Sequence, residues 1–89
     1  MKAVVSVLGH DRIGIVYQVT QLLAKHGFNI LDISQTIVDS YFTMIVVVEH
    51  EDENFALENV VGDYTALGES LGLDIRMQHA ALFSRMHHI

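Results

Sequence analysis

The side chains best placed for binding chemistry lie in one short loop, His10-Asp11-Arg12-Ile13-Gly14. An apolar run from Ala3 to Leu8 precedes it, and at Gly14-Ile15 the apolar spacing changes from strand-like to helix-like. A strand, a tight loop and a helix start leave backbone N–H groups without helical partners, and the helix dipole is positive there. The pattern therefore predicts an anion-binding site that uses the amides of Gly14 and Ile15.

Two other chemistries are disfavoured by the spacing of the polar residues. The chain has six histidines, but no pair lies at i, i+4, and His87-His88 are adjacent, so their side chains point apart. We expect no metal site and no cofactor. Ser6, Ser34 and Ser40 have no suitably spaced His or Asp partners and no nucleophile elbow, so we do not expect an enzyme.

Composition limits the class of protein. The 89 residues predict one domain, residues 1–89, and 51% of them are hydrophobic against 18% charged, which favours self-association. The net charge is −6 with five scattered Lys and Arg residues, so nucleic acid is not an expected partner. The longest apolar run, Met44 to Val48, is too short to span a membrane. The first strand begins near Met1 and leaves no room for a signal peptide, so a cytoplasmic location is expected.

The periodicity of the apolar residues predicts two helices and four strands. One helix runs from Gly14 to His26, and a second carries a stripe from Leu57 to Leu71 after the polar loop His50–Asn54. The strands are Ala3–Leu8, Asn29–Val38, Tyr41–Glu49 and Leu73–His79, with a turn at residues 39–40 and one or two helical turns in the tail, residues 80–89.

This order predicts an α+β fold, a ferredoxin-like βαββαβ sandwich. Its antiparallel sheet has the order 4-1-3-2 and both helices lie on one face. Strand Asn29–Val38 lies at an edge and contains no proline or lysine to prevent edge pairing, so a two-fold homodimer that extends the sheet is expected. The alternative is that the tilt of a helix or a bulge blocks this edge. The alternation within this strand predicts one buried and one wetter face. The helix-free face is expected to be wet or covered by a partner.

Four segments together resemble a stand-alone ACT domain: Gly9–Val16, His26–Ile30, Asp32–Thr36 and Phe42–Met44. The similarity covers nearly the whole chain and is strongest to the uncharacterised single-domain ACT proteins of prokaryotes. Related domains occur in formyltetrahydrofolate deformylase and in the glycine-cleavage regulator. The resemblance implies dimers that bind small ligands, most often amino acids, in regulation rather than catalysis.

The resemblance also implies a ligand site shared between two chains. The ligand would lie against the first βα loop, His10 to Ile15, and the partner would offer Asn29, Ile30 and Asp32. In this hypothesis the amides of Gly14 and Ile15 bind a carboxylate, Asp11 or Asp32 binds the ammonium, and Asn29 fixes orientation. Alternatively, Asp11 only caps the helix and Asn29 only shapes a turn.

Further residues of the loop and the hairpin leave the identity of the ligand open. Arg12 either holds an anion or is solvated, and His10 either contacts the ligand or is an ordinary loop residue. The family often has proline where His10 and Ile13 stand and glycine where Ser40 stands.

Two functions follow from these patterns. The first is a homodimer that binds an amino acid or similar metabolite and modulates an enzyme or regulator. The second is a protein–protein interaction or oligomerisation module with no functional ligand.

Overall fold

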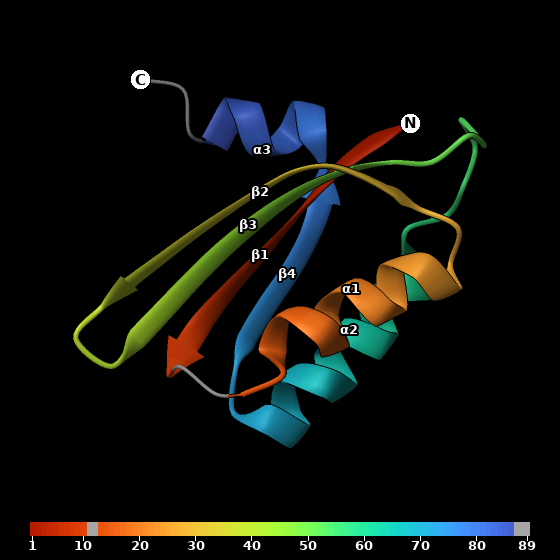
Figure 1. Cartoon of the computed structure of the whole chain (residues 1–89). Coiled ribbons are helices and arrows are strands. Elements are labelled where there is room, and N and C mark those ends of the chain that lie inside the picture. The colour runs from red at the N-terminus through yellow and green to blue at the C-terminus, as the bar shows by residue number, and fades with distance from the viewer. Residues whose placement is uncertain (11–12, 87–89) are drawn as a thin grey trace.

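The computed structural model describes residues 1–10 and 13–86, and the side chains of residues 84–86 are not described. The elements in chain order are β1 (Lys2–His10), α1 (Ile15–Lys25), β2 (Asn29–Val38), β3 (Tyr41–Glu49), α2 (Glu58–Leu71), β4 (Asp74–His79) and α3 (Ala80–Met86). Helices α1 and α2 lie together on one side of a single twisted sheet (Figure 1).

The sheet confirms the predicted topology. Its four strands have the order β2-β3-β1-β4, and β1 pairs antiparallel with both β3 and β4. Because β3 also pairs antiparallel with β2, strands β1 and β2 run parallel to each other. The predicted ferredoxin-like α+β fold is therefore correct, with β2 and β4 at the two edges.

The core lies between the sheet and the two helices. Tyr64, Leu23 and Met44 are its largest fully buried side chains. The Tyr64 hydroxyl donates a hydrogen bond of 2.7 Å to the backbone oxygen of Val19, which ties α2 to α1. Burial raises the pKa of Tyr64 above its ordinary value, so the phenol stays a neutral donor.

The loop before α2 is longer than the periodicity suggests, since α2 begins only at Glu58. Local hydrogen bonds hold this segment out of the helix. The N–H of Asn54 donates to Asp52 Oδ1 at 2.9 Å, and the N–H of Asp52 donates to His50 Nδ1 at 3.0 Å. Side chains of this kind compete with helical hydrogen bonding and favour turns.

Strand β2 corrects the sequence interpretation in two respects. Every one of its ten residues is exposed, so the predicted buried face is not buried within one chain. In addition, Ile30 pairs with Val48 and Asp32 pairs with Val47, which leaves Leu31 as an extra, bulged residue. The bulge moves Ile30 to the helix side of the sheet, together with Ile33, Gln35 and Ile37.

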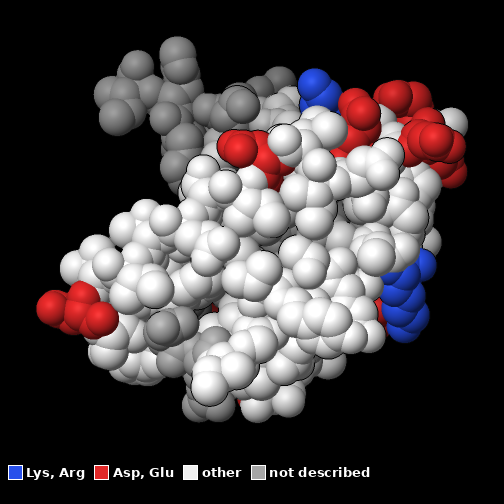
Figure 2. All heavy atoms as spheres, viewed as in Figure 1, with Lys and Arg blue, Asp and Glu red and all other residues white. Residues whose placement is uncertain are grey.

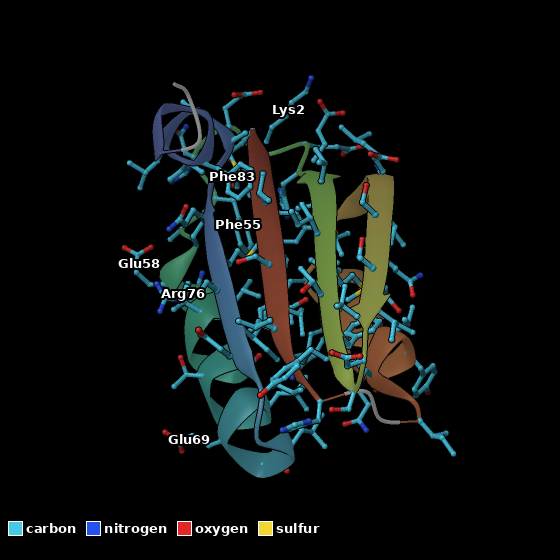
Figure 3. The ribbon with its side chains drawn as sticks, turned by 90° about the vertical axis from the view of Figure 1, so that its left-hand side faces the viewer. Lys2, Phe55, Glu58, Glu69, Arg76 and Phe83 are labelled. Carbon is cyan, nitrogen blue, oxygen red and sulfur yellow. The ribbon has the colours of Figure 1, made fainter. Side chains whose placement is uncertain are left out.

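The tail forms helix α3, as the sequence suggested, and it packs on the face of the sheet that α1 and α2 leave open. Figure 3 shows this open face, with Phe83 of α3 over the upper end of the sheet and Arg76 on β4. A groove of about 480 Å³ lies beside α3 and is lined by Ser6, Val7, Leu8, Thr43, Ile45, Asp74, Arg76, Gln78 and Phe83.

Two glycines of α2 allow a matched test of the packing of α2 against Leu73, the residue that leads into β4. A Cβ atom on Gly68 would lie 2.7 Å from the backbone oxygen of Leu73, whereas one on Gly62 would meet nothing within 4 Å. We expect Gly68→Ala to destabilise the fold by about 1–3 kcal/mol, because backbone must move. Gly62→Ala should stabilise it by about 0.5–1 kcal/mol through helix propensity.

Urea unfolding of both variants measures these changes in free energy. Equal effects of the two substitutions would contradict the close approach of Gly68 to Leu73.

Candidate functional site

The first βα loop begins where β1 ends, and His10 is the last residue of that strand. The His10 ring stacks on Tyr41 with a centroid distance of 4.8 Å, and its Nδ1 lies 3.5 Å from Ser40 Oγ. His10 is therefore held against the β2–β3 hairpin. Ile13, farther along the loop, is fully exposed. The predicted site residues Asp11 and Arg12 lie outside the described residues.

Gly14 forms the junction between the loop and α1. It occupies the N-cap position with a φ of 86°, a left-handed conformation that favours glycine. Glycine has no side chain with which to cap the helix, so within residues 1–10 and 13–86 the N-cap residue makes no side-chain hydrogen bond to the first-turn amides. The side chain of Ile15 is buried in the core, and this residue can therefore contribute to a site only through its backbone N–H.

The second group of predicted site residues stands at the beginning of β2. Asn29, Ile30 and Asp32 are all exposed. Asp32 is paired with Val47 on the open face, whereas Ile30 lies on the helix side opposite Val48. These three residues can offer an amide, an apolar surface and a carboxylate to a molecule that approaches the free edge of β2.

The turn between α1 and β2 is anchored on both sides. Gly27 has a φ of 82°, and the N–H of Phe28 donates to the backbone oxygen of Leu23 at 2.9 Å. His26 Nε2 donates to Asp63 Oδ2 at 2.8 Å, and the backbone oxygen of His26 accepts a bond of 3.0 Å from His50 Nε2. These contacts fix the position at which β2 begins.

Within one chain the two groups of residues are at opposite ends of the sheet. His10 and Val38 both pair with Tyr41 at one end of β3, whereas Asn29 pairs with Glu49 at the other. Over the nine residues of β3 this separation is about 27 Å. The structure thus places His10, Gly14 and Ile15 toward one end of the sheet, whereas Asn29, Ile30 and Asp32 lie toward the other.

The sequence interpretation missed the neighbours of the loop on β2 and β3. Ile37, Val38 and Tyr41 are all more than half exposed at the hairpin end of the sheet. The sequence signal that could have identified these neighbours is the presence of apolar residues on an edge strand without proline or lysine. In Figure 2 acidic side chains gather over the loop after β3 and one small acidic group lies at the hairpin tip, while the surface over α1 and the lower part of β2 is mostly uncharged.

The described residues show neither a candidate metal site nor a candidate membrane-spanning helix. Residues 1–10 and 13–86 contain no group of three or more His, Cys, Asp or Glu side chains arranged to hold a metal ion. None of the described helices combines the length and the apolar character that a membrane span requires.

Comparison with known proteins places this geometry in a family. The ACT domain profile matches residues 2–78. A UPF0237 protein of Bifidobacterium longum is 40% identical over 99% of this chain and 98% of its own length. An ACT domain protein from Streptococcus pneumoniae superposes with a TM-score of 0.82 at 41% identity, covering 93% of each chain.

A more distant structure is that of a putative glycine cleavage system transcriptional repressor. Its TM-score is 0.76 at 25% identity, and the match covers 89% of this chain and 45% of that one. The fold and these similarities show that the chain belongs to the ACT domain family. Its relatives of similar length are UPF0237 proteins, and ACT domains in general are small-molecule-binding regulatory domains.

The ion pair behind the α1–β2 turn predicts a pH dependence of stability. The hydrogen bond from His26 lowers the pKa of Asp63 below its ordinary 3.8. A carboxyl with a lowered pKa stabilises the fold above its unfolded pKa, and this contribution is lost as the pH falls through the folded value. The stability advantage of the wild type over Asp63→Asn should therefore decline below pH 3.8.

Urea unfolding at a series of pH values between about 5 and about 2.5 tests this. Glu69→Gln is the control, since Glu69 is an exposed acid on the same helix. An advantage that is the same at both ends of this pH range would contradict a role for the His26–Asp63 bond.

Proposed function

We propose that this protein is a regulatory domain that acts as a homodimer and binds an amino acid at the interface between two chains. The observation that carries the proposal is the separation of the candidate site into two halves. One half, at the loop, lies about 27 Å along the sheet from the other, at the start of β2. A second copy that pairs antiparallel along β2 would bring the start of its strand to the loop of the first.

The exposure and the composition of the free edge of β2 support this pairing. Its free edge is ten residues long and carries no proline or lysine, and all of its side chains are exposed. Ile30, Ile33 and Ile37 lie on the helix side but remain 41%, 36% and 57% exposed. The β2 edge of a second copy would pair with the unpaired backbone groups of this strand. The helix layer of that copy would cover these isoleucines.

The chemistry of the two halves suits a zwitterion. The N–H groups of Gly14 and Ile15, at the positive end of α1, would bind the carboxylate, an interaction worth about 0.3–2 kcal/mol. Asp11 of the same chain or Asp32 of the second copy would bind the ammonium. Asn29 and Ile30 of the second copy would orient the ligand. His10 could contact the ligand, and Arg12 could hold an anion.

The activity proposed is regulation without catalysis. The Ser40 hydroxyl lies 3.5 Å from His10 Nδ1, but this contact is exposed and at the limit of a hydrogen bond. One solved neighbour is described as a putative glycine cleavage system transcriptional repressor. The ligand-bound dimer would modulate an enzyme or regulator in the cytoplasm. In this proposal residues 1–89 form a single ACT domain.

A ligand screen by thermal shift tests the function. Each of the common amino acids is added to the wild-type protein, and a true ligand at about 100 times its Kd should stabilise the fold by about 2.7 kcal/mol. Asn29→Ala and Asp32→Asn should each reduce the shift. Asn59→Ala, on the exposed surface of α2, is the matched control and should retain it.

A flat response to every amino acid would contradict the proposal. Together with recovery of a protein partner by pull-down, that result would favour the alternative function, an interaction module that uses the β2 edge without a ligand.

A further inference from the structure

The bulge at Leu31 restricts how two copies of β2 can pair. From Asp32 to Val38 the residues alternate regularly between the two faces, with Ile33, Gln35 and Ile37 on the helix side. On the other side of the bulge, Ile30 also lies on the helix side because it pairs with the buried residue Val48.

A two-fold axis that joins two β2 edges into one sheet imposes a further condition. Residues directly opposite each other in an antiparallel pair project to the same face. In the regular segment 32–38, an axis that passed between two residues would pair opposite faces, for example Ile33 with Ser34. The axis must therefore lie midway between the two copies of one residue, so that this residue is opposite its own symmetry mate.

Ser34 satisfies this condition over the full strand. An axis at Ser34 pairs Ile33 with Gln35 and Asp32 with Thr36. The extra residue, Leu31, is then skipped, as it is against β3, and the pairing continues as Ile30 with Ile37 and Asn29 with Val38.

The other possible axes leave part of the strand unpaired. With the axis at Ser34, both members of every pair lie on one face, and neither end of β2 overhangs its partner strand. An axis at Ile33 or Gln35 leaves at least the last two residues at one end of each strand overhanging.

We infer that two copies of this chain pair about Ser34, and this inference rests on the homodimer proposed above. The pairing brings the exposed Ile30 of one copy against the exposed Ile37 of the other, twice in each dimer. It sets no like charges opposite each other, since Asp32 faces Thr36. It also sets Asn29 beside Val38 of the other copy, at the end of the sheet where β1 leads into the Gly14 turn.

The absence of cysteine from the chain allows a direct test. Opposed residues in antiparallel strands have Cα atoms about 4.5–5.5 Å apart, within the range of a disulfide. We expect the Ser34→Cys variant to form a covalent dimer on mild oxidation, without change of the mass measured in solution before oxidation.

Two matched variants define the register. Thr36→Cys lies on the same strand and face, but its symmetry mate is offset by about 13 Å along the strand, so it should not link to itself. Asp32→Cys should behave in the same way. A mixture of these two variants, exchanged and then oxidised, should yield the mixed covalent dimer because residues 32 and 36 are opposed.

The outcomes separate this inference from the proposed function. The pairing about Ser34 is overturned, and the homodimer left standing, if the protein sediments as a dimer but the Ser34→Cys variant does not form the covalent dimer. Self-linking of the Thr36→Cys variant in that dimer would show a shifted register. A protein that is monomeric at every concentration overturns both the pairing and the homodimer.

Discussion

The free edge of β2 is the constraint on which the rest of the structure depends. Nine of its ten residues pair with β3 on one side only, and three isoleucines face the helix layer without being covered by it. Backbone polar groups and apolar side chains are thus exposed along the same line. A sheet edge of this kind is stable in solution when something pairs with it. The apolar composition of the chain is consistent with that requirement.

The topology explains why the candidate site is divided. Strands β1 and β2 are parallel, and helix α1 connects the end of one to the beginning of the other. The end of β1 and the start of β2 must therefore lie at opposite ends of the sheet. Gly14 and Gly27, both with positive φ, mark the two ends of the helix that separates the halves. A second copy that pairs antiparallel along β2 would bring the start of its own β2 to the end of β1 in the first copy.

Much of the fold follows from the sequence because it depends on local patterns. The helical spacing predicts α1 to within a residue at each end, and the four strands with their order follow from the βαββαβ sequence of elements. The position of the Gly14 turn was predicted for the same reason, since a switch from strand-like to helix-like spacing is visible in the residues themselves.

Other features depend on contacts between distant residues and were not predictable. The bulge at Leu31 arises from pairing with β3, and it reverses the face that simple alternation assigns to Ile30. Burial of β2 was predicted from its apolar residues, but the helix layer of one chain does not cover it. Similarly, the helical tail was expected, whereas its position on the open face was not.

Native mass spectrometry of the protein as purified tests the central claim most directly, because it reports the number of chains and any bound small molecule together. The account predicts a complex with the mass of two chains, with additional mass that corresponds to small ligands. A single chain at all protein concentrations would contradict it, because one copy cannot bring the Gly14 turn and Asn29 together.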